Sequence, residues 1–375
     1  MSHLERYKMI YNELGKSGIK ISALSFGSMR WQSERACHEI IHRGLDLGMN
    51  YIDTSSGYVG GQSEKWSGSA VKNRRDEIYF SSKSNWAQAP DARSVRRSIE
   101  SSLKKAGLDH FDFYQIWGLQ SAHTLEKALA KGGTVEGVRR AQKEGLITVG
   151  LGFTFHGDAD LFKAAVDTGE FLCATVSYNL LKRRQEELLD YAAANGVGTI
   201  IMNPLGGGTL ATDSSLDFLC HDADGRKFGP WYGALRFLLA NKSITTAIVG
   251  FRQLEEVDLN LEALEGAESL DEAYRRDLAA RVAATRLPKE DFCTGCGYCR
   301  DCPNDFNPTK FMQAIRDFEI DGQGSLKNWL EVKYIGQSPA QELEKCVECG
   351  WCEEQCPQHL KIVTEITKAK ALFGL

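Results

Sequence analysis

The chain has 375 residues, of which 25% are charged and 42% hydrophobic, and its formal net charge is −5. This composition is typical of globular proteins, and it excludes the basic footprint of a nucleic-acid-binding protein. The first residues, MSHLERYKMI, are polar and charged, and no run of roughly 18 apolar residues follows. We therefore expect a cytoplasmic protein with no signal peptide, no lipid attachment and no membrane span.

Short apolar runs alternate with amphipathic stretches between about residue 9 and residue 270. Eight runs are candidate strands, at residues 23–26, 50–53, 78–83, 112–117, 147–151, 173–177, 198–202 and 246–249. Stretches such as ARSVRRSIESSLKKAGL carry apolar residues at helical spacing. Eight strand–helix units predict a closed (β/α)8 TIM barrel, whereas the rival open doubly wound sheet lacks a G-x-G-x-x-G after its first strand. Residues 9–22, with the turn GKSG, predict a hairpin that plugs the N-terminal end of the barrel.

The chain divides into two predicted domains. Residues 1–285 form the barrel, and residues 286–375 form a small, mainly α-helical domain. Residues 265–291 are expected to be a helix followed by a linker, with Pro288 as the boundary. In the second domain, the segments PTKFMQAIRDFE and SLKNWLEV are expected to be helical.

Eight of the eleven cysteines are gathered in two evenly spaced runs near the C-terminus. The three scattered ones, Cys37, Cys173 and Cys220, are expected to be buried thiols. The first run is Cys293, Cys296, Cys299 and Cys302, and the second is Cys346, Cys349, Cys352 and Cys356; a proline follows each fourth cysteine.

In two-cluster ferredoxins the fourth cysteine of each run binds the other cluster. That rule assigns one 4Fe-4S cluster to Cys293, Cys296, Cys299 and Cys356, and the other to Cys346, Cys349, Cys352 and Cys302. The second domain is therefore expected to be a small, mainly α-helical ferredoxin-like iron–sulfur domain. Zinc is the alternative, but tetrahedral zinc sites use two cysteine pairs separated by a spacer. The first run departs from the bacterial pattern, because its last gap has two residues instead of three.

Polar residues stand at the ends of two predicted strands, in YIDTSSGY and SSK. In a TIM barrel the active site lies at the C-terminal ends of the strands. Lys83 beside Tyr58 is expected to lower the pKa of the phenol, so that Tyr58 delivers a proton to a carbonyl oxygen while Asp53 holds Lys83. The alternative is a structural ion pair between Asp53 and Lys83, with Tyr58 as a loop aromatic.

The segments YIDTSSGY, SSKSNW, FDFYQIWGLQ, SYNLL, NPLGGGTL and IVGFRQLEEVDLN, in this order, resemble the aldo-keto reductase superfamily. The resemblance covers about residues 10 to 265, and it points to the branch that carries a C-terminal 4Fe-4S ferredoxin domain. It implies hydride transfer from NADPH to a carbonyl, with Tyr58 as the general acid and Lys83 and Asp53 as its tuners.

The fourth catalytic position of the family is normally a histidine, and here it is Trp117. An indole N–H donates one hydrogen bond but neither titrates nor accepts. Some relatives that reduce C=C bonds also lack this histidine. We therefore interpret Trp117 as a change of substrate and not as a loss of activity. His123 follows nearby, but we expect a solvated loop histidine there.

The resemblance also implies a set of NADP(H) contacts, namely Thr154, Tyr178, Leu205, Gly206, Gly208, Arg252 and Asn260. Tyr178 would stack under the nicotinamide, although a core aromatic at a strand end is an alternative. Arg252 suits the 2′-phosphate, because its planar fork makes several charge-assisted hydrogen bonds. Three positions depart from the family: Phe155, Thr175 and Leu259 replace the usual Asn, Gln and Glu.

The sequence predicts an NADP(H)-linked oxidoreductase acting on a small carbonyl, its alcohol or an activated C=C bond, with electron transfer through two 4Fe-4S clusters. An external ferredoxin or another electron carrier is the expected partner, besides a small-molecule substrate. A flavin would split a hydride into single electrons, but the sequence has no flavin motif. Two alternatives are a ferredoxin-linked oxidoreductase that does not use nicotinamide, favoured by Trp117 and Phe155, and a non-enzymatic redox-sensing or partner-binding subunit.

Overall fold

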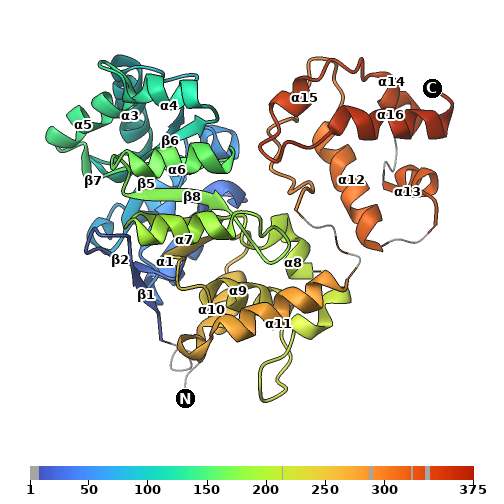
Figure 1. Cartoon of the computed structure of the whole chain (residues 1–375), viewed down its shortest axis with the longest axis horizontal. Helices are drawn as coiled ribbons and strands as arrows, with labels where there is room; N and C mark the ends of the chain where they lie inside the picture. The colour runs from blue at the N-terminus through green and yellow to red at the C-terminus, as the bar shows by residue number, and fades with distance from the viewer. Residues whose placement is uncertain (1–7, 213, 286, 288–289, 322–323, 334–337) are drawn as a thin grey trace.

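The computed structural model describes residues 8–212, 214–285, 287, 290–321, 324–333 and 338–375. It has two parts, a barrel wrapped in helices and a helical module drawn in orange and red in Figure 1. Pro288 and residue 286, where the sequence places the boundary, lie outside the described residues. None of the described helices combines the length and the apolar character needed to cross a bilayer.

Eight parallel strands close into a barrel in the order β10-β3-β4-β5-β6-β7-β8-β9. All eight predicted strands are confirmed, as β3 (Leu24–Gly27), β4 (Tyr51–Asp53), β5 (Tyr79–Asn85), β6 (Phe111–Leu119), β7 (Ile147–Phe155), β8 (Cys173–Ser177), β9 (Gly198–Met202) and β10 (Thr246–Gly250). The open doubly wound sheet is therefore excluded, because β10 pairs with β3 and closes the ring.

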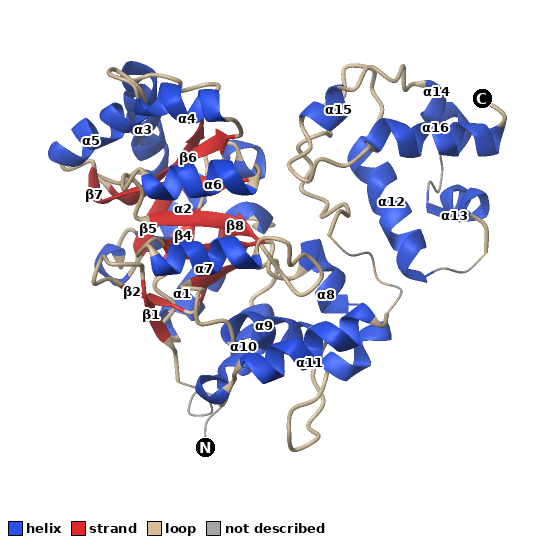
Figure 2. Cartoon of the chain, viewed as in Figure 1, coloured by secondary structure: helices blue, strands red, loops and turns tan. Residues whose placement is uncertain are grey.

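Helices cover the outside of the barrel, as Figure 2 shows in blue around the red strands. They are α1 (Glu34–Asp46), α2 (Ser63–Val71), α3 (Ala92–Ala106), α4 (Ala122–Leu129), α5 (Thr134–Lys143), α6 (Ala159–Asp167), α7 (Glu186–Ala194), α8 (Thr209–Thr212), α9 (Trp231–Leu239), α10 (Glu255–Leu261) and α11 (Glu272–Ala283). Helix α3 shows why these segments are helical. Asp91 closes a capping box at its start, and Gly107 ends it in the left-handed region at φ 67°.

The N-terminal hairpin plugs the barrel floor, as predicted. Strands β1 (Tyr11–Glu13) and β2 (Lys20–Ser22) pair antiparallel. Leu14 and Ile21 are completely buried in one cluster with residues from the barrel interior, among them Phe113. The plug excludes water from the N-terminal end, which leaves the C-terminal end of the strands as the open face.

The C-terminal module has its own hydrophobic core. Its helices are α12 (Pro308–Asp321), α13 (Leu326–Lys333), α14 (Pro339–Glu344), α15 (Trp351–Glu354) and α16 (Ile362–Phe373), so both segments predicted to be helical are confirmed. Phe311, Leu330 and Ile366 are fully buried in this core. The three scattered cysteines are buried in the barrel, as expected for thiols that pack as small apolar side chains.

The module docks on the loops that follow barrel strands. Both carboxylate oxygens of Glu290 accept hydrogen bonds from backbone N–H groups after β8, those of Arg183 and Arg184, at 3.1 and 3.3 Å. Lys182 donates from Nζ to Oε1 of Gln358 at 2.5 Å. These contacts place the cysteine loops over the open end of the barrel.

Candidate active site

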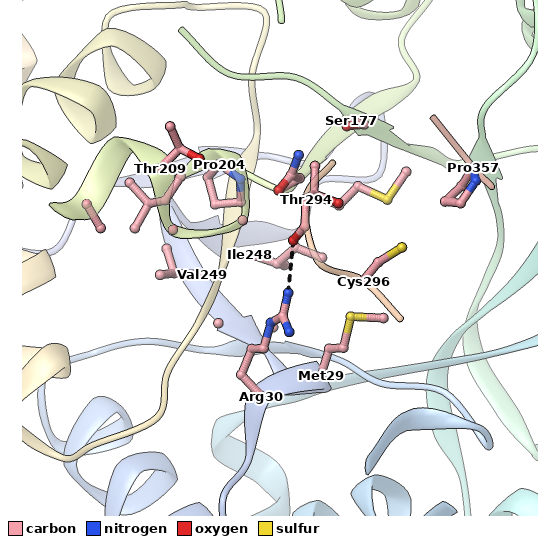
Figure 3. Close-up of a pocket in the computed structure, with 18 of the residues that line it drawn as sticks. Met29, Arg30, Ser177, Pro204, Thr209, Ile248, Val249, Thr294, Cys296 and Pro357 are labelled. Atoms are coloured by element: carbon pink, nitrogen blue, oxygen red, sulfur yellow. Dashed lines mark hydrogen bonds between the residues drawn. The ribbon is translucent and has the colours of Figure 1, made fainter. Parts of the chain in front are cut away.

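A cavity of about 850 Å³ lies at the C-terminal ends of the strands. Every barrel strand contributes to its wall, through Gly27, Asp53, Lys83, Trp117, Thr154, Ser177, Met202 and Ile248. The opposite wall comes from the iron–sulfur module, through Thr294, Cys296 and Tyr298 among others. Figure 3 shows Cys296 together with Met29 and Arg30 of the barrel among the residues that line this cavity. The volume is within the usual range for small-molecule and cofactor sites.

Asp53 and Lys83 form a buried ion pair on the cavity floor, with side chains only 2% and 4% exposed. Lys83 also donates to the carbonyl of Thr54 at 2.9 Å, and Gln115 donates to the second carboxylate oxygen of Asp53 at 2.8 Å. Burial raises the pKa of Asp53 despite the opposing charge of Lys83. The ion pair between Asp53 and Lys83 is therefore present, and both residues line the cavity.

Tyr58 follows β4, at the start of a short 3-10 helix, and it lines the same cavity. Lys83 Nζ lies over its ring face, 4.9 Å from the ring centroid. The expectation of a lowered phenol pKa is wrong: burial and the charge of Asp53 raise the pKa of Tyr58. Tyr58 is therefore a protonated phenol at neutral pH, which is the form that a proton donor needs.

Trp117, at the end of β6, meets a residue that the sequence did not single out. Its ring centroid lies 5.3 Å from that of Tyr298, with 36° between the ring planes. His123 does not fill this place, because it is exposed and lies on α4 instead of a loop. This part of the cavity wall is thus built from two aromatic rings.

Most of the predicted NADP(H) contacts do line the cavity: Thr154, Leu205, Gly208, Arg252 and Asn260. Several cavity-lining polar atoms are buried and make no hydrogen bond within the described residues, namely Thr154 Oγ1, Ser177 Oγ, Asn203 Nδ2 and Thr209 Oγ1. Unpaired buried polar atoms are costly, so this set fits a ligand that brings both donors and acceptors, such as a carboxamide and a phosphate.

Tyr178 is not brought to the cavity. Its ring is fully buried and stacks on Phe237 at 5.8 Å, and its hydroxyl pairs with Glu186 and Arg275 at 3.0 and 3.3 Å. The structure therefore favours the alternative interpretation, in which Tyr178 is a core aromatic and not a nicotinamide contact. Its hydroxyl is already hydrogen-bonded to Glu186 and Arg275. Phe155 also points into the core, where it packs edge-on against Phe162.

The glycine loop after β9 borders the cavity on one side and the C-terminal module on the other. Gly206 and Gly207 stand at φ +60° and +69° in a 3-10 turn (Gly206–Gly208). Gly207 and Gly208 line the cavity, whereas Gly206 faces the ring of Phe292. A Cβ on Gly207 would lie 2.3 Å from the carbonyl oxygen of Thr294, so the loop and the iron–sulfur module touch backbone to backbone.

The first cysteine set is compact. Cys356 lies close enough to raise the pKa of both Cys296 and Cys299, and Cys296 with Cys299 does the same to Cys293. Burial raises the pKa of Cys293 to about 12, so its thiolate needs a strongly positive partner, which iron supplies. The backbone N–H of Gly295 points at Cys293 Sγ, 3.4 Å away. These features fit a cluster at Cys293, Cys296, Cys299 and Cys356.

The second set is more open. Cys352 is buried, and its pKa is raised by burial, by Cys299 of the first set and by Cys346, while Cys349 is exposed. The N–H of Glu348 points at Cys346 Sγ at 3.4 Å, with Glu348 at φ +58°. Among the described residues no three His, Cys, Asp or Glu side chains gather around a single metal ion. A cubane, by contrast, is held by thiolates at separate iron atoms.

Sequence reasoning missed Arg30, Ser177, Asn203 and Tyr298. The guanidinium of Arg30 donates to the carbonyls of Gly295 and Thr294, both at 3.3 Å, as the dashed line to Thr294 shows in Figure 3. Arg30 and Asn203 could have been found because they follow predicted strands, and Ser177 because it ends one. Tyr298 carries no such signal, because it belongs to the other module.

A model of the Aldo/keto reductase family matches residues 23–276, and a model of the 4Fe-4S dicluster domain matches residues 290–360. L-galactose dehydrogenase from Arabidopsis thaliana is 27% identical over 295 residues, which covers 70% of this chain and 90% of that protein.

Two solved structures share the barrel. Aldo-keto reductase AKR11C1 from Bacillus halodurans superposes with a TM-score of 0.62 at 22% identity, covering 73% of this chain and 96% of that one. An aldo/keto reductase from Klebsiella pneumoniae in complex with NADP and acetate does so with a TM-score of 0.60 at 20% identity, covering 74% and 95%.

Proposed function

The chain belongs to the aldo/keto reductase family and carries a 4Fe-4S dicluster domain, and we propose that it couples the two as one NADP(H)-linked oxidoreductase. Its substrate is a small carbonyl compound, the corresponding alcohol or an activated C=C compound. The observation that carries this proposal is that Cys296, a predicted cluster ligand, lines the same cavity as Tyr58.

The barrel residues handle the proton. Tyr58 holds its proton at neutral pH and faces the cavity, so its hydroxyl is available to a developing alkoxide. Lys83 and Asp53 keep the floor of the cavity electrically balanced beneath it. The match to an L-galactose dehydrogenase supports a carbonyl or alcohol group as the reacting function.

The cavity also has the donors for a nicotinamide dinucleotide. Thr154 and Ser177 offer unpaired hydroxyls at the ends of β7 and β8, and Arg252 with Asn260 lies at the far wall. The barrel superposes on a Klebsiella pneumoniae relative described with bound NADP. When bound, NADP(H) supplies or accepts a hydride, and each cluster exchanges a single electron.

The second cluster loop is the proposed contact for an external ferredoxin or another one-electron carrier. Cys349 is exposed there, and Val347 is 63% exposed. Eight thiolates that must remain reduced favour a reducing compartment such as the cytoplasm.

An anaerobic titration tests this function. The cluster-loaded chain is mixed with NADPH and para-nitrobenzaldehyde while nicotinamide fluorescence and the visible absorbance of the clusters are followed. We expect NADPH to bind and to be consumed with the aldehyde, and the Tyr58→Phe variant to turn over at least about 100-fold more slowly. Unchanged turnover by Tyr58→Phe would contradict the proton-donor role.

A ferredoxin-linked reaction without nicotinamide is the second candidate. The contact between Gly207 and Thr294 favours it, because the module occupies space along the loop that the family uses for the pyrophosphate. The core position of Tyr178 favours it too. If dithionite-reduced ferredoxin supports turnover and NADPH neither binds nor supports it, this candidate replaces the first.

A further inference from the structure

Tyr298 belongs to the iron–sulfur module in sequence and to the barrel cavity in space. It stands between Cys296 and Cys299, two predicted cluster ligands, and yet its side chain lines the cavity together with Asp53 and Lys83.

Tyr58 and Tyr298 line the same cavity, and their hydroxyls lie close enough for each to affect the pKa of the other. Lys83 lies over the face of the Tyr58 ring, so it cannot fix the direction of the Tyr58 hydroxyl. Tyr58 therefore has a neighbour in the cavity that comes from across the module boundary.

The ring of Tyr298 is fixed by its neighbours. Trp117 lies against it at 5.3 Å, within the range in which aromatic pairs attract. The preceding loop is anchored to the barrel, since Arg30 donates to the carbonyls of Thr294 and Gly295. Gly297, at φ +79°, makes the turn that sends the tyrosine into the cavity.

We propose that Tyr298 is a positioning residue of the barrel active site, which aims the Tyr58 hydroxyl and closes, with Trp117, the wall where the family normally has a histidine. This inference rests on the proposed role of Tyr58 as proton donor. It means that the barrel active site is completed by the iron–sulfur module, so the presence of the cysteine loop and the geometry of proton delivery are linked.

The test uses the cluster-loaded full chain without oxygen, para-nitrobenzaldehyde and NADPH. Tyr298→Phe keeps the ring and removes the hydroxyl. We expect kcat to fall roughly tenfold or more and KM to stay within about twofold, because positioning acts on the transition state. Iron and acid-labile sulfide content stay at the wild-type level. The matched control is Tyr191→Phe, which removes a tyrosine hydrogen bond to Asp167 of 2.6 Å on the exposed outside of the barrel.

Two further measurements separate positioning from structure. In a double-mutant cycle, Tyr298→Phe should cost nothing more once Tyr58→Phe is present, because Tyr298 acts through Tyr58. In addition, 3-fluorotyrosine placed at position 58 should give a ¹⁹F resonance that shifts in Tyr298→Phe and stays in place in Tyr191→Phe.

Wild-type kcat in Tyr298→Phe, additive losses in the cycle, or loss of iron from the single variant would each overturn the inference. An unshifted ¹⁹F resonance would overturn the contact itself. Because the resonance needs no turnover, it decides the contact even if the wild-type chain reduces no carbonyl, an outcome that would end the proposed function alone.

Discussion

His359 donates a hydrogen bond from its Nε2 to the backbone carbonyl of His156, 2.8 Å away. His156 follows β7, and the backbone of Pro357 lies close enough to its ring to affect the pKa of the imidazole. The two histidines thus tie the segment after Cys356 to the rim of the barrel. This docking has consequences for pH, for packing and for the clusters.

The first prediction concerns acid stability. Burial, with Lys182 and His359 nearby, lowers the pKa of His156 to about 3, from an ordinary value of about 6.5. The folded chain keeps this imidazole neutral, whereas the unfolded chain binds a proton below pH about 6.5. Stability is therefore full above that pH and is lost as the pH falls toward 3.

Between pH 7.5 and 5.5 the wild type should lose about 1 kcal/mol of stability relative to His156→Gln. Urea denaturation of the cluster-loaded chain without oxygen measures this difference. His123→Gln, which alters an exposed histidine on α4, should keep the wild-type pH dependence. Parallel curves for wild type and His156→Gln would contradict a neutral, buried His156.

The second prediction concerns the ion pair under the cavity. Lys83→Met leaves the Asp53 carboxylate buried without its counter-charge, which costs about 3–5 kcal/mol of stability. The double variant Asp53→Asn with Lys83→Met should recover most of that loss and remain inactive. Arg35→Ala, which breaks the exposed pair with Glu39, should change stability by less than about 1 kcal/mol. Equal losses from the buried and exposed pairs in chemical denaturation would refute this account.

The third prediction concerns the seam between the modules. Gly207→Ala places a methyl group 2.3 Å from the Thr294 carbonyl, so the cysteine loop must move away from the barrel. We expect the clusters to bleach several-fold faster in air. Gly107→Ala is the matched control: its φ of +67° gives a similar backbone strain of about 1–2 kcal/mol, but nothing lies within 4 Å of the added methyl. Equal bleaching of the two variants would mean that strain, and not the contact, matters.

The fourth prediction tests which cysteines share a cluster. Two clusters hold about eight iron atoms per chain, and Cys296→Ser should leave about four. Adding Cys356→Ser should remove no more iron, because both residues serve one cluster. Adding Cys302→Ser instead should remove nearly all of it. Cys37→Ala, in the barrel core, should keep the full complement. The reverse pattern of iron loss would show that the fourth cysteines do not cross over.

The fifth prediction concerns the cofactor. Arg252→Ala should weaken NADPH binding about 10- to 100-fold and leave NADH binding unchanged, because only NADPH carries a 2′-phosphate for the guanidinium. Calorimetry on the anaerobic chain measures both constants. Arg93→Ala, on the exposed start of α3, should bind both cofactors as the wild type does. An equal loss of affinity for NADPH and for NADH would contradict a contact between Arg252 and the 2′-phosphate.

Local patterns in the sequence determined the barrel. A strand such as 198–202 is recognisable because it is apolar along its whole length, and a helix such as α3 because its caps and its apolar spacing lie within a few residues of each other. The place of Asp53 and Lys83 at the open end followed from the same reasoning, since neighbouring parallel strands end at the same side. The two cysteine runs were equally local.

Only the tertiary structure decided what those residues meet. Tyr178 lies at a strand end in the sequence, but its hydroxyl partner Arg275 is far away on α11 and draws it into the core. Tyr298 reaches Tyr58 across 240 positions of chain, through docking contacts that no periodicity encodes. Hydrophobic spacing specifies which face of an element is buried, whereas contacts between modules depend on shape and unpaired polar groups that exist only once both have folded.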